Sequence, residues 1–231
     1  MSWLYTILMG FVFFAAVAML IREGLWSNLL TLFNVLFSGL LAFSLHGPVT
    51  IWLDEWLKGE YTYLLDFLVL WAIFSLSMLA LRIVTDTLSR VRVRFKKPVE
   101  SAGGPIAAVI AAWVVLGFTS ATFNTVPLAK GFLGNAIVVE NEQDVEPSLT
   151  RPHLQWLRFV ASSIMKLGDA DTVEELKDQL DGISKQKEYA EFCRGCEFIN
   201  ADLWARAFVV KYQLRREQFE TNTSTLRVKR G

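Results

Sequence analysis

The sequence predicts an all-α protein, a four-span transmembrane helical bundle with a C-terminal amphipathic-helical tail, and three observations support this fold class. Of the 231 residues, 53% are hydrophobic and 20% are charged, which is more apolar than an ordinary soluble domain. Residues 1–126 carry 8 basic and 7 acidic side chains, whereas residues 127–231 carry 15 and 16. The first part also contains four long apolar segments. Because the net charge is zero, no basic surface supports binding to nucleic acid.

The four apolar segments are long enough to cross a bilayer, whose core of about 30 Å needs roughly 20 helical residues. The expected spans cover residues 3–21, 25–45, 63–84 and 104–126. Because unpaired backbone groups are costly in lipid, all four should be helices, and residues 1–126 form one membrane domain. Only three residues join the first two spans, which requires an antiparallel hairpin. For the first span, a cleaved signal peptide ending near Ala18 is the alternative.

The Lys and Arg residues of the short links predict the orientation. The link between the third and fourth spans contains five cations: Arg90, Arg92, Arg94, Lys96 and Lys97. We expect this link in the cytoplasm, where it contacts anionic lipid headgroups or, alternatively, docks a cytosolic partner. The link 46–62 has Lys58 as its one basic residue, so this link, the N-terminus and the tail are expected outside the cytoplasm. Trp52 and Trp56 fit a short interfacial helix within link 46–62.

Small residues follow one side of the fourth span. Gly104, Ala108 and Ala112 share one helical stripe, and Gly103 begins the neighbouring stripe. Helices in lipid approach each other closely through such residues, because burying apolar surface gains little there. The second span adds a similar group around Gly39. This pattern predicts close packing, either within one chain or between the copies of a homo-oligomer.

Three polar residues within or beside the spans are candidates for function, because a charge in hydrocarbon costs roughly 2.5–3.5 kcal/mol even on lenient scales. Asp66 lies one turn into the third span, and His46 follows the second span at a similar expected depth. A protonatable Asp66–His46 pair could act as a relay or bind an ion. The alternatives are that Asp66 stays hydrated near the headgroups or caps its helix. Asn34, midway along the second span, is expected to form an interhelical hydrogen bond.

The tail divides into a linker at 127–152, which is rich in acidic residues and proline, and a helical extramembrane part at 153–231. Three amphipathic helices are expected there, forming a small bundle or lying on the membrane. One apolar stripe comprises Leu154, Leu157, Ala161, Ile164 and Leu167, and another comprises Leu203, Ala207, Val210 and Leu214. Arg215 and Arg216 are expected away from the second stripe.

Cys193 and Cys196 form a Cys-x-x-Cys motif in the tail. This spacing fits a disulfide, a redox pair or half of a zinc site. If the tail is extracytoplasmic, a local disulfide is favoured over two free thiols or a catalytic dithiol. The sequence contains no P-loop, nucleophile elbow, zinc-protease motif or dinucleotide fingerprint. We therefore expect a protein without catalytic residues, metal or other cofactor.

Two short segments carry a family resemblance. Arg22-Glu23-Gly24-Leu25 joins the first two spans, and Glu100-Ser101-Ala102-Gly103-Gly104 leads into the fourth. With the four-span pattern over residues 3–126, the chain resembles the colicin V production protein (CvpA) family of bacterial inner-membrane proteins. The resemblance implies a role in toxin (colicin V) production or export, or in envelope maintenance, through the lipid bilayer and other envelope or membrane proteins.

Two hypotheses of other classes are also open. In one, the protein is a subunit of an oligomeric transporter or channel in which Asp66 faces a wet cavity. In the other, Cys193 and Cys196 make it a membrane-tethered thiol oxidoreductase.

Overall fold

The computed structural model describes residues 3–57, 62–88, 97–126 and 151–164, together with 204–205, 208–209, 211–213 and 215–216 of the tail. Its helices are α1 (Trp3–Leu20), α2 (Leu25–Trp56), α3 (Thr62–Leu88), α4 (Lys97–Phe123) and α5 (Pro152–Ile164). The described part of the chain contains no strand. The first four helices are long and apolar enough to cross a membrane. The predicted all-α fold with four candidate spans is thereby confirmed.

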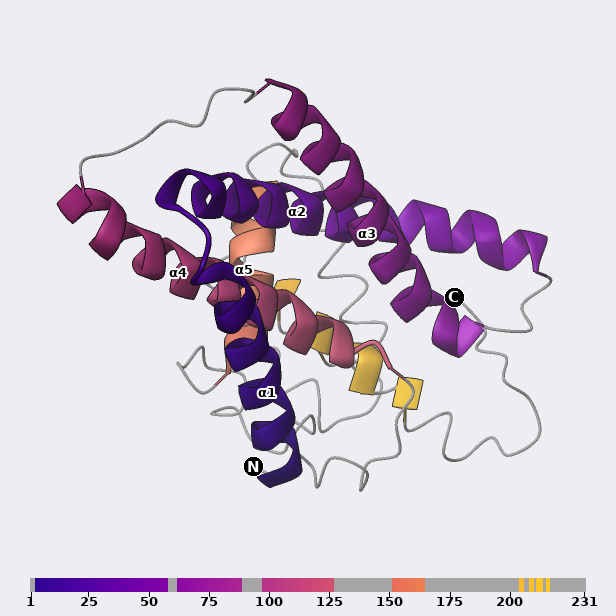
Figure 1. Ribbon diagram of the computed structural model, residues 1–231. Helices are drawn as coiled ribbons and strands as arrows, with labels where there is room; N and C mark the ends of the chain where they lie inside the picture. Colours follow the sequence, from indigo (N-terminus) through magenta and orange to yellow (C-terminus); the bar gives the residue numbers. More distant parts are fainter. Residues whose placement is uncertain are drawn as a thin grey trace.

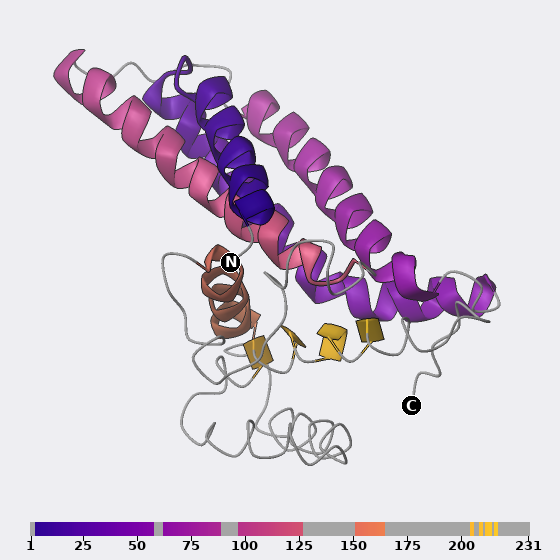
Figure 2. The same cartoon turned by 90° about the horizontal axis from the view of Figure 1, so that it is seen from below.

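The second span differs most from its expected boundary. We expected it to end at residue 45, but α2 continues to Trp56 through most of the predicted 46–62 link. Trp52 and Trp56 are exposed on this extension. Figure 2 shows the last part of α2 turning away from the first part, and Pro48 lies inside the helix. A proline removes one backbone hydrogen bond and is a common cause of such a bend.

The fourth span also begins earlier than expected, at Lys97 rather than residue 104. Pro98 stands in its first turn, where a missing backbone N–H costs nothing, because the first N–H groups of a helix have no intrahelical acceptor. Glu100, in the same turn, carries the negative charge that the positive end of the helix dipole favours. These residues extend α4 beyond its apolar stretch.

The helices α2 and α4 form the centre of the bundle. α2 packs against α3 and α4, while α1 packs against α4 on the other flank (Figures 1 and 2). The close contact of α4 with its neighbours depends on alanines: Ala108, Ala111 and Ala112 are completely buried. α1 and α3, by contrast, leave large apolar side chains exposed, such as Phe11, Phe14 and Leu76. In a bilayer these outer faces meet lipid or partner helices.

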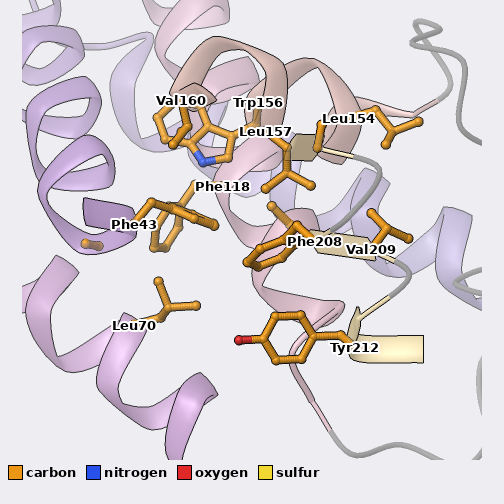
Figure 3. Close-up of a cluster of buried hydrophobic side chains, with 13 residues drawn as sticks. Phe43, Leu70, Phe118, Leu154, Trp156, Leu157, Val160, Phe208, Val209 and Tyr212 are labelled. Carbon is orange, nitrogen blue, oxygen red and sulfur yellow. The ribbon is translucent and has the colours of Figure 1, made fainter. Parts of the chain in front are cut away.

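The tail packs against the half of the bundle in which α4 ends. α5 packs against α4 and α2. Side chains from α5 and from the segment 204–216 join Phe43, Leu70 and Phe118 of three spans in one buried cluster (Figure 3). The tail residues of this cluster are Leu154, Trp156, Leu157, Val160, Ala205, Phe208, Val209 and Tyr212. The tail therefore shares a hydrophobic core with the spans.

Candidate functional site

A largely buried ion pair lies where α3 begins and α4 ends, and we call this region the Asp66 end: Asp66, Asn124, Arg215 and Arg216. Asp66 is 5% exposed, although it is an ionisable residue one turn into a candidate span. Arg215 of the tail donates a hydrogen bond through Nη1 to Asp66 Oδ2 and forms an ion pair with it. A partly buried guanidinium thus compensates the carboxylate.

Two further contacts hold the arginines at this end. The guanidinium of Arg215 lies 5.1 Å from the centroid of the Tyr212 ring, a cation–π distance. Arg216, 5% exposed, donates through Nη1 to the carbonyl oxygen of Asn124 at 2.8 Å. Asn124 directly follows α4, so Arg216 places positive charge at the negative end of that helix dipole. The tail therefore neutralises both a carboxylate and a helix terminus.

The pair restricts the chemistry of Asp66. Breaking a buried ion pair by removing one partner costs about 3–5 kcal/mol, because an uncompensated charge remains. In the described arrangement, Asp66 accepts a hydrogen bond from a permanently charged group and anchors the tail. Release of Arg215 would leave an ionisable carboxylate within a span, which is the chemical property that a relay or ion site requires.

His46, the predicted partner of Asp66, lies nearby on α2. Its Nδ1 is 2.8 Å from the carbonyl oxygen of Phe43. The imidazole packs edge-on against Phe43 and Phe208, with ring centroids 6.0 and 6.4 Å apart. Aromatic rings from α2 and the tail therefore fix the orientation of His46. The Asp66–His46 relay itself stays a prediction.

A second feature of this region is a slot for the Trp156 indole, formed by Gly39 of α2 and Gly117 of α4. A Cβ added at Gly39 would lie 2.4 Å from Cζ2 of Trp156, and one at Gly117 would lie 3.1 Å from its Cβ. A side chain at Gly39 would overlap the indole, and one at Gly117 would fit only if Trp156 shifted by a few tenths of an ångström. Trp156 also packs edge-on against Phe43 and Phe118 (Figure 3). The glycines thus dock α5 between two spans.

The opposite end of the bundle, which we call the Glu100 end, comprises Glu23, Leu25, Asn28, Glu100 and Gly104. Glu100 Oε1 accepts a hydrogen bond from the backbone N–H of Leu25 at 3.1 Å, capping the start of α2. Asn28 Nδ2 donates to the carbonyl oxygen of Gly104 at 2.9 Å. The two short segments that carry the family resemblance therefore touch each other.

The other residues predicted from the sequence fall into three groups. Gly104, Ala108 and Ala112 are buried inside the chain, while Gly103 lies half-buried beside Leu25. Asn34, 1% exposed, donates through Nδ2 to Thr85 Oγ1 of α3 at 3.1 Å. Of the basic link, Lys97 is the first residue of α4. The remaining predicted residues lie outside the described residues: Arg90, Arg92, Arg94, Lys96, Cys193 and Cys196.

The sequence pattern missed the residues that complete the Asp66 end. We expected Arg215 and Arg216 only to lie away from the predicted apolar stripe, and the structure adds that both contact the bundle. The buried residues described in this segment are Ala205, Phe208, Val209, Tyr212, Gln213 and Arg216. The stripe predicted instead (Leu203, Ala207, Val210, Leu214) lies outside the described side chains. A lone carboxylate in a span signals that a countercharge is needed, but this signal does not locate its partner.

No group of three or more His, Cys, Asp or Glu side chains is arranged to hold a metal ion among the residues that the structure describes. With four long apolar helices and polar groups paired across them, the chain is a multi-pass membrane protein. A family model described as colicin V production protein matches residues 5–153. The chain therefore belongs to the colicin V production protein (CvpA) family, which confirms the resemblance.

The matched region extends beyond residue 126, where we expected the resemblance to end, and reaches the first turn of α5. Neither a search of curated proteins nor a search of solved structures found a significant match to this chain.

Proposed function

We propose that the protein acts in the bacterial inner (cytoplasmic) membrane as a non-catalytic component of colicin V production or export, or of envelope maintenance. The observation that supports this most is the family match, which covers all four candidate spans. In this proposal, other envelope or membrane proteins bind the outer faces of α1 and α3. α1 buries only Tyr5 and Met9, which leaves most of its surface for lipid and partners.

The proposed orientation places the basic link in the cytoplasm and both the N-terminus and the tail outside it. Lys and Arg of short links favour the cytoplasmic side. Reporter fusions after Thr62, Lys97 and Gly231 test this topology. We expect cytoplasmic reporter activity only for the fusion after Lys97. Cytoplasmic activity after Gly231 would overturn the proposed side of the tail and the disulfide between Cys193 and Cys196.

The functional experiment is complementation of a bacterium that lacks its own member of this family and carries the genes for colicin V. We expect the chain to restore either colicin V in the culture medium or resistance of the envelope to detergent. Restored secretion alone assigns production or export, whereas restored resistance alone assigns envelope maintenance. If a correctly inserted chain restores neither, the proposal is wrong.

The second candidate is a subunit of an oligomeric transporter or channel, and the buried ionisable pair Asp66–Arg215 favours it. Its test is ion flux into proteoliposomes that contain the wild type, Asp66→Asn, or Asp86→Asn as a matched control, together with the oligomeric state of each. Asp86 pairs with Arg82 on the exposed face of α3. A flux lost only in Asp66→Asn, in an oligomer, would replace the leading proposal. Equal flux in all three would rule this candidate out.

The thiol hypothesis requires Cys193 and Cys196. Full complementation by a Cys193→Ser, Cys196→Ser double variant would remove it.

A further inference from the structure

The position of α5 along the spans can be measured from its contacts. Gln155 of α5 accepts a hydrogen bond through Oε1 from Trp113 Nε1 of α4 at 3.1 Å. Trp113 precedes the last residue of α4, Phe123, by ten positions, or about 15 Å of helix. Gly117, which contacts Trp156 and the carbonyl oxygen of Pro152, precedes it by six positions, or about 9 Å. α5 therefore contacts α4 well below its end.

Counting residues along α2 gives a similar depth. Trp156 contacts Gly39, seven positions or about 10 Å before His46. His46 packs against Phe208 of the tail and lies near enough to Asp66, Lys211 and Arg215 for their charges to act on its imidazole. We place the water boundary near this level, because Lys211 of the same tail segment is exposed and a lysine ammonium is strongly hydrated. The Trp156 contact thus lies about 10 Å inside that boundary along α2, and about 9 Å before the end of α4.

From this depth we propose that α5 is embedded in the membrane leaflet at the Asp66 end, as a fifth membrane segment that does not cross the bilayer. A bilayer core of about 30 Å gives each leaflet about 15 Å, so the Trp156 contact lies within the acyl chains. Phe159, 40% exposed, is the large apolar side chain on the outward side of α5. Its partner on that side is lipid.

The polar side chains of α5 suit such a position. Gln155 is bonded to Trp113. The hydroxyl groups of Ser162 and Ser163 both donate to the carbonyl oxygen of Phe159, at 2.9 and 2.8 Å. Internal hydrogen bonds of this kind let serine lie in lipid without an unpaired donor. Arg158 has a stem long enough for its guanidinium to reach the headgroups. The Gln155 carbonyl and the two serine hydroxyls therefore have hydrogen-bond partners without water.

The test is a spin label at position 159 in the full chain, reconstituted in phosphatidylethanolamine–phosphatidylglycerol vesicles with Cys193 and Cys196 replaced by Ser. Collisions with oxygen and with a water-soluble nickel complex report depth. We expect Phe159→Cys to resemble Phe14→Cys on the outer face of α1, with several-fold more contact with oxygen than with nickel. Asp86→Cys, beside the exposed Arg82, is the water reference. A Phe159 label that resembles Asp86→Cys would overturn the proposal.

Two glycine variants test the cause of this position. Gly39→Leu fills the slot of Trp156, whereas Gly10→Leu adds a side chain where nothing lies within 4 Å. We expect the label at position 159 to collide more often with the nickel complex in Gly39→Leu, and its collision rates to stay unchanged in Gly10→Leu. Equal collision rates in both variants would show that the slot for Trp156 does not determine the depth of α5. If Phe159→Cys fails to fold, Ser162→Cys provides a second label, with the same outcomes.

Discussion

The two ends of the bundle are held together in different ways. At the Glu100 end, a side chain caps the backbone of α2, and the contacting residues lie within the region matched by the family model. At the Asp66 end, a carboxylate of α3 pairs with Arg215, 149 positions later and outside the matched region. The first end is therefore built from the family region alone, whereas the second also needs the tail of this chain.

The two ends also differ in the free-energy cost of losing one of their contacts. A capping bond leaves only a backbone N–H unsatisfied when it is lost, and water or another group can replace the carboxylate. A buried ion pair leaves a charge in low dielectric when one partner is lost. The bundle should therefore tolerate changes at the Glu100 end better than changes at the Asp66 end.

The largest expected effect comes from breaking the ion pair. Arg215→Leu should lower the free energy of unfolding by about 3–5 kcal/mol, since Asp66 remains buried without its countercharge. Reversible unfolding in mixed detergent micelles measures this change. The control is Arg82→Leu, which removes an exposed ion pair of 3.6 Å and should cost under about 1 kcal/mol. Equal losses in the two variants would contradict the asymmetry between buried and exposed pairs.

The next largest effect is expected from acid, which should weaken the packing of α5. Burial lowers the pKa of His153 in α5 from 6.5 to about 4, and the charge of Arg151 lowers it further in the same direction. Between these two pKa values the unfolded chain binds more protons than the folded chain. The contribution of neutral His153 to the free energy of unfolding is therefore fully present above pH 6.5 and decreases as the pH falls toward 4. We expect a loss of roughly 1–3 kcal/mol, measured as unfolding against pH. His153→Asn should flatten this part of the profile, and an unchanged slope would refute the assignment.

The smallest effect is expected at the Glu100 end. Glu100→Ala should cost about 1 kcal/mol by removing the cap of the Leu25 N–H. Glu55→Ala, on the exposed last turns of α2, is the control and should change stability by less than about 0.5 kcal/mol. The same unfolding assay applies. A loss at Glu100 as large as that of Arg215→Leu would remove the contrast between the two ends.

The sequence predicted the spans well because hydropathy and length are local properties, and α1 to α4 each contain a long apolar stretch. Their boundaries were less predictable. The amphipathic residues 46–56 continue α2 as a helix, and the polar residues before Gly104 extend α4 toward its start. Neither extension has an apolar signal.

Tertiary partners were the least predictable part. Asn34 was expected to bond another helix, and Thr85 could not be identified in advance because helical periodicity says nothing about registry between helices. Gly39 was placed on a packing face, but its occupant, Trp156, comes from the tail. Arg215 was expected only to lie away from an apolar stripe, because its own segment does not reveal the carboxylate of α3 with which it pairs. Only the folded chain brings these residues together.

The separation of 149 positions between Asp66 and Arg215 also orders events in time. At synthesis rates of roughly 5–20 residues per second, Asp66 is added to the chain about 7–30 s before Arg215. During that interval the nascent chain has an acidic span without its cation. Formation of the Asp66–Arg215 ion pair is therefore a late step of biogenesis. A chain that terminates before Arg215 would enter the membrane without this pair.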